Sequence, residues 1–308
     1  MRVAYFPKNE QEAKLFAQEF LAQGVHYQVF RPPDVWLHCN NHITTGAGPQ
    51  LSLQDLDSTT DTNIPFDGFD LVFQRSVTSW NQTYGRHIVD FFFDVLYLTH
   101  KTMPVVNPPL PTIAARKKHV AAAILARHGI RVPQYFASPN PIRNMRITRI
   151  TPPPTIVKTL EGAAGIGVLL APDPQVLGDI ISLFYKNQHV PILQTYIPVP
   201  HDLRVFVLGD RVIGAIRRQG TIYKHNVALG AAATYVPPAK LPPELTELAL
   251  AASHHLQLHI AGVDLLTPAT GPLILEVNPS PGFQALARAS QTNIQHQIVT
   301  YLVDLTRS

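Results

Sequence analysis

Two apolar segments near the C-terminus constrain the fold more than any other feature of this sequence. AGVDLL begins at residue 261, PLILEVN ends at residue 278, and only a short turn containing Pro and Gly separates them. Short apolar runs joined by such a turn predict a buried antiparallel hairpin. Each run has a carboxylate in its middle, Asp264 in the first and Glu276 in the second. The chain is therefore expected to place two acids inside a sheet.

The register of this hairpin follows from where its turn is centred. If Thr270 is the centre, Asp264 and Glu276 face each other, because each lies six residues away. Facing residues of an antiparallel pair have Cβ atoms ~4.5–5.5 Å apart. Asn278 shares a face with Glu276 and lies opposite Gly262, which is expected to leave room above the amide.

The three oxygen-bearing side chains, Asp264, Glu276 and Asn278, predict a magnesium site. Two carboxylates this close repel, and without a cation one of them is expected to protonate. A set of few, hard oxygen ligands suits Mg²⁺, whose remaining positions are often filled by substrate phosphates, so a nucleotide is indicated. The alternative is a pair of edge-strand acids that face water or are neutralised by arginines. The rigid turn NPSPG, which starts at Asn278, favours the metal.

A glycine-rich segment, KTLEGAAGIGV, is the candidate phosphate cradle. Gly162, Gly165 and Gly167 lie between two predicted strands, where backbone N–H groups can approach phosphate oxygens. It is neither a Walker A loop nor a clear Rossmann fingerprint, and a simple tight hairpin is the alternative. Lys158, on the strand before it, could reach a phosphate or could be a surface charge.

A second hairpin, DLRVFVLGDRVIGAIRRQ, is predicted to turn on Gly209-Asp210. Asp202 and Arg204 share a face of the first strand. Around a two-residue turn, strand parity places Arg217 opposite Asp202. A guanidinium there would bind a phosphoryl group or a carboxylate. The alternative is a surface salt bridge, which contributes little stability.

The remaining pattern indicates an α/β fold. The chain has 308 residues, of which 45% are hydrophobic and 15% charged, as in globular proteins. Apolar runs around a helical segment at residues 9–24 predict a β-α-β start. Residues 38–66 are expected to be mostly loop, and the proline-rich residues 104–117 a linker before an Ala-rich helix.

Charge and cysteine content exclude some partners and favour a cytoplasmic enzyme. The net charge is +4 without a run of five like charges, so no nucleic-acid partner is expected. Cys39 is the single cysteine, which fits a reducing compartment. The N-terminus lacks an apolar signal core, and the apolar residues 89–100 are too few to span a bilayer, so no membrane partner is expected.

In their order, these motifs resemble the ATP-grasp superfamily, and most closely its RimK-type family of ribosomal-protein glutamate ligases and relatives. The resemblance covers roughly residues 100–308. It implies an N-terminal Rossmann-like α/β domain at 1–98 and an α+β ATP-grasp domain with antiparallel sheets at 99–308. The latter would have a lid lobe at about 115–195 and a core lobe at about 196–308.

The resemblance also implies roles for individual residues. Those at the reacting phosphate would be Arg204 and Arg218, and those on the substrate Arg75 and Asn226. Ligands of Mg²⁺ or Mn²⁺, present as two ions, would be Asp264, Glu276 and Asn278. ATP would be bound by Lys118, Lys158, Gly162, Gly165, Gly167, Gln194, Thr195, Tyr196, Ile197, Asp202, Lys224 and Asn226.

Several positions depart from the family pattern. Lys117 stands where Asp is usual and Thr195 where Glu is usual. Ala228 and Leu229 replace a basic pair near the acceptor, which leaves the added amino acid open between glutamate and a less anionic one. The family pattern selects Arg218 where strand parity selects its neighbour Arg217, and the two agree only if a β-bulge intervenes.

The implied reaction is ATP-dependent ligation of a carboxylate and an amine through an acyl phosphate, with release of ADP and phosphate. An amino acid would be added to a small-molecule or peptide carboxylate, and a homo-oligomer is common among such relatives. Two alternatives use the same site: a small-molecule kinase, and a protein that binds ATP without catalysis.

Overall fold

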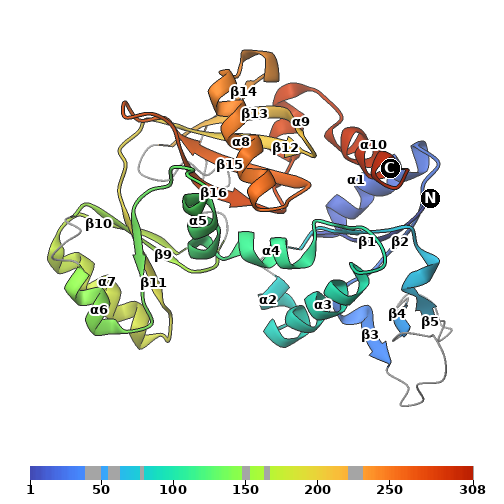
Figure 1. Cartoon of the computed structure of the whole chain (residues 1–308), viewed down its shortest axis with the longest axis horizontal. Coiled ribbons are helices and arrows are strands. Elements are labelled where there is room, and N and C mark those ends of the chain that lie inside the picture. The colour runs from blue at the N-terminus through green and yellow to red at the C-terminus, as the bar shows by residue number, and fades with distance from the viewer. Residues whose placement is uncertain are drawn as a thin grey trace. The chain divides into compact units, whose positions relative to one another are not determined.

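The structure is a computed structural model that describes residues 1–38, 50–54, 63–76, 80–147, 153–162, 167–220 and 232–307. It divides into two compact units (Figure 1). Unit 1 comprises Met1–Ile113, Leu258–Ile260 and Thr292–Ser308, and unit 2 comprises Ala114–Gln257 and Ala261–Gln291. The predicted mixed α/β architecture with antiparallel sheets is confirmed. Unit 1 runs to residue 113 and includes the C-terminal segment, and the domain boundary between residues 98 and 99 stays a prediction.

Unit 1 is built on a parallel sheet with the strand order β2-β1-β6-β7. Its strands are β1 (Arg2–Phe6), β2 (His26–Val29), β6 (Leu71–Gln74) and β7 (Val105–Val106). The predicted β-α-β start is present, with α1 (Glu10–Ala22) between the first two strands. Asn9 caps this helix, since its Oδ1 accepts from the backbone N–H of Glu12 at 2.9 Å. Gly24, with φ +67°, lets the chain turn back into β2.

Aromatic side chains form much of the core of unit 1. Phe16 and Phe20 of α1 lie 5.6 and 5.5 Å from the ring of Tyr5, which stacks on Phe73 at 5.3 Å. Such pairs contribute about 0.5–1.5 kcal/mol each beyond the area that they bury. On α3 (Arg86–Thr99), Phe92 packs on Phe6 with centroids 4.9 Å apart. Helix α3 is therefore a core element of unit 1.

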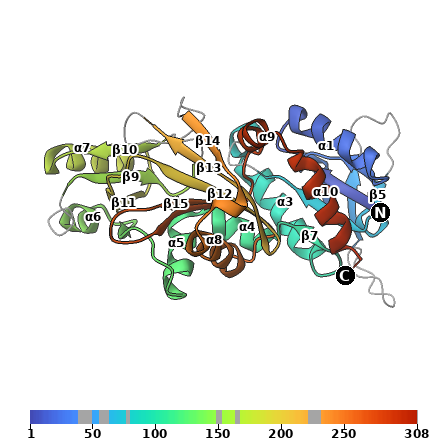
Figure 2. The ribbon, with the colours of Figure 1, turned by 90° about the horizontal axis from the view of Figure 1, so that it is seen from above.

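The C-terminal helix α10 (Ile294–Leu305) packs against α1 within unit 1 (Figure 2). Glu19 of α1 accepts from Asn293 Nδ2 at 2.9 Å and pairs with His296 Nδ1 at 2.7 Å. These contacts join residues more than 270 positions apart and hold the two helices together.

Two segments expected to lack regular structure contain some. A small sheet in the order β3-β4-β5 lies within the predicted loop, formed by β3 (Val35–His38), β4 (Gln50–Gln54) and β5 (Asn63–Pro65). In β4, leucines alternate with Gln and Ser, a period of two that the surrounding polar residues obscure. The predicted linker contains α4 (Pro109–Arg116), whose prolines occupy the first turn, where no intrahelical N–H donor is required. Short elements complete the unit: η1 (Pro32–Asp34), η2 (Phe66–Gly68) and α2 (Trp80–Thr83).

The first sheet of unit 2 is antiparallel, in the order β10-β9-β11-β8. Its strands are β8 (Tyr135–Ala137), β9 (Thr155–Thr159), β10 (Val168–Ala171) and β11 (Pro191–Thr195). Helices α6 (Pro141–Ile147) and α7 (Pro174–Lys186) lie together beside it, and α7 contacts three of the strands (Figure 1). The buried face of α7 packs on β9 and β11 through Leu177, Ile181 and Phe184.

The second sheet of unit 2 has the order β14-β13-β12-β15-β16. Its strands are β12 (Asp202–Leu208), β13 (Arg211–Gln219), β14 (Ala232–Val236), β15 (Ile260–Leu266) and β16 (Leu273–Asn278). The helices that contact it are α5 (Lys118–Arg127), α8 (Pro243–His255) and α9 (Gln284–Ser290), and η4 (Pro238–Lys240) precedes α8. Both predicted hairpins therefore belong to one sheet.

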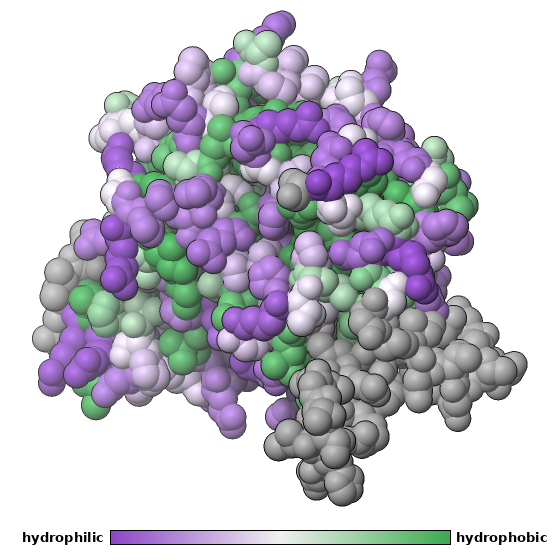
Figure 3. Space-filling view, turned by 45° about the vertical axis from the view of Figure 1, so that its right-hand side comes forward, coloured by the Kyte–Doolittle hydropathy of each residue, from purple (hydrophilic) through white to green (hydrophobic). Residues whose placement is uncertain are grey.

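Hydrophobic side chains on the face drawn in Figure 3 are interspersed with hydrophilic ones, which is the usual mixture at a water-facing surface. Over the described parts of the chain, none of the helices combines the length and the apolar character needed to cross a bilayer.

Candidate active site

The β15–β16 hairpin has the predicted register around its acids. Asp264 pairs with Glu276, and Gly262 pairs with Asn278. Closer to the turn, a bulge after Asp264 shifts the register. The prediction of free space above Asn278 is wrong, because other side chains fill it. A Cβ atom at Gly262 would lie 2.8 Å from Pro281 Cβ and 3.6 Å from Arg204 Cδ. The glycine is required by this close approach.

Asp264 is buried and held by two arginines. Arg204 donates from Nε to Oδ1 and from Nη2 to Oδ2, both at 2.7 Å, and Arg218 Nη2 lies 2.9 Å from Oδ2. Burial alone raises the pKa of Asp264, but the charges of Arg204 and Arg218 outweigh it and lower the pKa to about 2. The carboxyl group is therefore ionised.

A β-bulge decides which arginine faces the acids. The register of β12 and β13 shifts between Phe206 and Val207, so that Asp202 pairs with Arg218. The parity prediction of Arg217 opposite Asp202 is wrong, since it assumed a regular two-strand ladder. Arg217 is exposed instead.

Asp202 and Arg218 form a buried ion pair, and each side chain is 4% exposed. Arg218 Nε and Nη2 donate to the two carboxylate oxygens at 2.7 and 2.6 Å. Burial lowers the pKa of Arg218, while Asp264 and Asp202 raise it by more, so the guanidinium stays charged. The side chains alternate in charge along the row Asp202, Arg218, Asp264, Arg204.

Lys158 of β9 points into the protein, which excludes the surface-charge alternative. It is 7% exposed, and its Nζ donates to Gln194 Oε1 on β11 at 2.8 Å. Burial is the largest influence on its pKa, which falls to about 8, although the charge of Glu276 opposes the fall.

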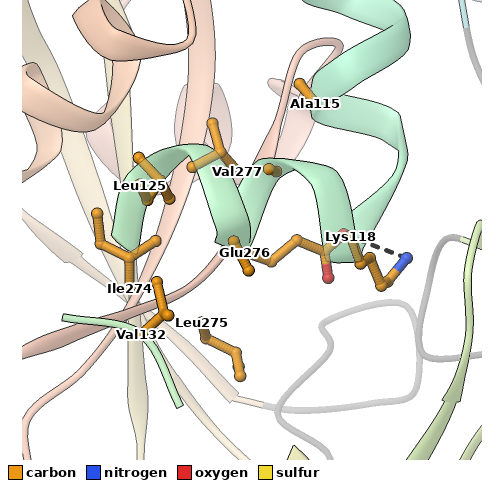
Figure 4. A pocket seen from close by; sticks show the side chains of 10 residues that line it. Ala115, Lys118, Leu125, Val132, Ile274, Leu275, Glu276 and Val277 are labelled. Carbon is orange, nitrogen blue, oxygen red and sulfur yellow. Dashed lines mark ion pairs between the residues drawn. The ribbon is translucent and has the colours of Figure 1, made fainter. Parts of the chain in front are cut away.

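Lys118, the first residue of α5, links the glycine-rich segment to the acids. Its Nζ donates to Gly162 O at 2.7 Å and lies 3.7 Å from Glu276 Oε1 (Figure 4). Its backbone N–H donates to Leu160 O at 3.1 Å. At the other end of the segment, Gly167 has φ +73°, and a Cβ there would meet the side chain of Thr159 at 3.0 Å. The segment joins the antiparallel pair β9 and β10, as predicted.

A small pocket opens beside this ion pair, between α5 and β16 (Figure 4). Its walls are mostly apolar and include Ala121, Leu125 and Ile274, while Lys118 and Glu276 supply its charged groups. The pocket thus combines apolar walls with one cation and one anion.

The comparison with known families decides the classification. The model of the RimK-like ATP-grasp domain matches residues 115–302, which is more than half of the chain. The chain belongs to the RimK-like ATP-grasp family. This confirms the family predicted from the motifs. It also confirms the predicted enzyme class, because this is a family of ATP-dependent carboxylate–amine ligases.

Individual relatives agree with this RimK-like ATP-grasp assignment. The chain is 35% identical to the "Probable alpha-L-glutamate ligase 2" of Shewanella amazonensis over 202 residues, 64% of this chain and 66% of that protein. It is 30% identical to the protein of the same name from Shewanella frigidimarina over 312 residues, 98% of this chain and 96% of that protein. Its fold is similar to that of the "ATP-grasp ligase PsnB complexed with minimal precursor, Mg, and ADP", with a TM-score of 0.70, 18% identity, and coverage of 100% of this chain and 98% of that one.

The donor set of this RimK-like ATP-grasp domain fits a magnesium ion. Asp264, Glu276 and Asn278 bring two carboxylates and an amide oxygen to facing and neighbouring positions of one hairpin. The side chain of Glu276 is 30% exposed, so a ligand can approach it. Asn278 Oδ1 accepts from Ser280 N at 2.8 Å, which fixes the amide at the start of the NPSPG turn.

Other predicted site residues are placed in different ways. The backbone N–H of Thr195 donates to Gln134 O at 2.9 Å, and Tyr196 and Ile197 follow β11, half-buried. Arg75 lies in the core of unit 1, where its guanidinium pairs with Glu12 at 3.1 Å and is 1% exposed. Its predicted contact with substrate stays a prediction. Outside the described residues lie Cys39, Gly165, Lys224, Asn226, Ala228 and Leu229.

Arg131 is a residue of the site region that the sequence did not reveal. Its Nη1 donates to Thr270 O at 2.6 Å, and its backbone O accepts from Ile274 N at 2.9 Å. It thus holds both the turn and the first part of β16. A contact across 139 residues leaves no local signal in the sequence.

Proposed function

We propose that the protein joins the amino group of an amino acid, glutamate or a similar one, to the carboxylate of a peptide or small molecule, with ATP converted to ADP and phosphate. The observation that carries this proposal is that Arg204 and Arg218 both bind the carboxylate of Asp264. These residues and the two lysines belong to the segment that matches the family model. Cations in this arrangement suit a reaction in which negative charge moves among phosphate oxygens.

The proposed chemistry has two steps. A carboxylate oxygen of the acceptor attacks the γ-phosphorus of ATP, the bond to the β-phosphate breaks, and ADP leaves with its electron pair. The amine then attacks the acyl carbon, phosphate leaves, and the ammonium proton passes to solvent. No side chain of the protein forms a covalent bond, so the protein acts by positioning and charge neutralisation.

Side chains of this chain supply that neutralisation. In this proposal Lys158 and Lys118 bind nucleotide phosphates, and Arg204 and Arg218 offset charge on the transferred group. Removing one such contact typically costs ~2.7–4 kcal/mol of barrier. A metal ion held by Asp264, Glu276 and Asn278 supplies further charge neutralisation of the phosphates when bound. Gln194 of β11 accepts a hydrogen bond from Lys158 Nζ, which keeps the lysine inside the site.

The substrate classes in this proposal have separate support. Two similar proteins carry the name "Probable alpha-L-glutamate ligase 2", which favours glutamate as the amino acid. PsnB, of similar fold, was solved with a precursor, Mg and ADP, which favours a peptide acceptor. Two metal ions and a homo-oligomer follow from the family resemblance, and a cytoplasmic location from the single cysteine; all three belong to the proposal.

The test is an incubation with magnesium-ATP, a panel of amino acids and a peptide extract, followed by mass spectrometry for new amides. ADP release that depends on both substrates, together with a mass gain of one amino acid residue, is the expected result. A stable phosphorylated product formed without any amine would favour the kinase. Glu276→Gln should abolish the amide, whereas Glu247→Gln, on the exposed face of α8, should not change it.

A further inference from the structure

The guanidinium of Arg204 occupies the carboxylate that a metal ion would need. It binds both oxygens of Asp264 at 2.7 Å, and Arg218 adds a contact to Oδ2 at 2.9 Å. A carboxylate offers about four acceptor positions, so three of the four are filled by N–H donors. A divalent cation on the remaining position would lie beside a positive charge.

The two arginines differ in how firmly they are held. Arg218 is 4% exposed and also binds both oxygens of Asp202, so its position is fixed from two sides. Arg204 is 19% exposed, and its hydrogen-bond partner among the described residues is Asp264. Arg204 can therefore move away from Asp264 without breaking the buried ion pair between Asp202 and Arg218.

The charge of the site without ligands is also informative. Arg204, Arg218, Lys118 and Lys158 contribute four positive charges, and Asp202, Asp264 and Glu276 contribute three negative ones, which leaves a net charge of +1. Such a site attracts a polyphosphate and does not attract a free cation. Two facing acids without these four cationic side chains would instead attract a free cation.

We propose that Arg204 is an exchangeable counter-ion that makes the site selective for a metal–nucleotide complex over a free divalent cation. Before the nucleotide enters, Arg204 neutralises Asp264. When phosphate oxygens arrive, the two N–H groups move from Asp264 to the phosphate, and the released carboxylate oxygen becomes a metal ligand. The inference rests on the proposed function only in that the site binds a nucleotide.

The probe is Mn²⁺, whose free concentration can be followed by electron paramagnetic resonance at low ionic strength, without amino acid or acceptor. We expect wild-type protein to bind Mn²⁺ weakly alone and at least a hundredfold more tightly with ADP. In Arg204→Met, binding of Mn²⁺ without ADP should strengthen at least tenfold, and the gain from ADP should shrink accordingly. Arg217→Met, an exposed arginine on the same sheet, is the matched control and should resemble wild type.

Two further variants keep the test decisive. Adding Asp264→Asn to Arg204→Met should remove the gained Mn²⁺ binding, which assigns the ion to this carboxylate. Arg204→Lys keeps the charge but loses the paired hydrogen bonds, so Mn²⁺ binding should strengthen at least threefold, even if the Met variant does not fold. Unchanged Mn²⁺ binding in folded Arg204 variants overturns the inference.

The outcome also separates this inference from the proposed function. If wild-type protein binds neither ADP nor Mn²⁺ with ADP, the nucleotide site itself is refuted. If it binds both, and the Arg204 variants match Arg217→Met, only the counter-ion role is refuted.

Discussion

Raising the pH from 7 to 9 is expected to weaken ADP binding, because Lys158 loses its proton in this interval. The ammonium group lies inside unit 2, 7% exposed, with Gln194 Oε1 as its hydrogen-bond acceptor at 2.8 Å. Burial lowers its pKa to about 8 from the usual 10.5. An ordinary surface lysine would stay charged through the whole interval.

The size of the effect follows from this pKa. With a pKa of about 8, roughly nine-tenths of the Lys158 side chains are protonated at pH 7 and roughly one-tenth at pH 9. If only the ammonium form binds phosphate, the affinity for ADP falls about tenfold, which corresponds to ~1.4 kcal/mol. The sign is fixed: affinity is highest below pH 8 and decreases above it.

The assay is a calorimetric titration with ADP, repeated at several pH values between 7 and 9. Lys158→Arg is the control, because a guanidinium keeps its charge over this range. The control should give a flat profile, and wild-type protein a falling one. A flat wild-type profile, or an equal fall in both proteins, would refute the assignment of Lys158 as a buried phosphate-binding cation.

Three other perturbations have defined outcomes. Asp202→Asn removes one of the two acids that pair with the buried Arg218 and should lower the free energy of unfolding by up to about 3–5 kcal/mol, whereas adding Arg218→Met should restore most of it; equal losses in denaturant titrations of both would contradict this. Gly262→Ala forces a Cβ atom to 2.8 Å from Pro281 and should destabilise by about 1–3 kcal/mol in the same titration, and no change would contradict the close packing. Glu276→Gln should weaken Mn²⁺ binding in the presence of ADP at least tenfold while its circular dichroism stays native, and unchanged binding would remove Glu276 from the metal ligands.

Local pattern was sufficient for the elements that carry the site. The two short apolar runs predicted β15 and β16, and the symmetric placement of Asp264 and Glu276 about the turn predicted their pairing, because the turn sets the register of a hairpin. The β12–β13 hairpin shows the limit of this argument. A bulge between Phe206 and Val207 moves the register by one residue, and Gly214, which pairs with Phe206 at the shift, is the one residue type that points to it.

Contacts between distant residues were the other limit. One alternative for the two acids was that arginines neutralise them. This is what the structure has at Asp264, which binds Arg204 from the neighbouring hairpin. Arg75, for which the family likeness implies a substrate role that stays a prediction, pairs with Glu12 in the buried interior of unit 1. In both cases the residue type was informative, but the partner is set by packing over 60 or more positions.

Transfer of oxygen from acceptor to phosphate tests the ligase mechanism most directly. An acceptor identified by amide formation is labelled with ¹⁸O in both carboxylate oxygens and turned over once with unlabelled ATP and water. If the carboxylate attacks the γ-phosphate, each phosphate released with an amide carries one ¹⁸O atom. Unlabelled phosphate released with each amide, so that the lost ¹⁸O appears in water or in AMP, would contradict an acyl phosphate and the function proposed for this site.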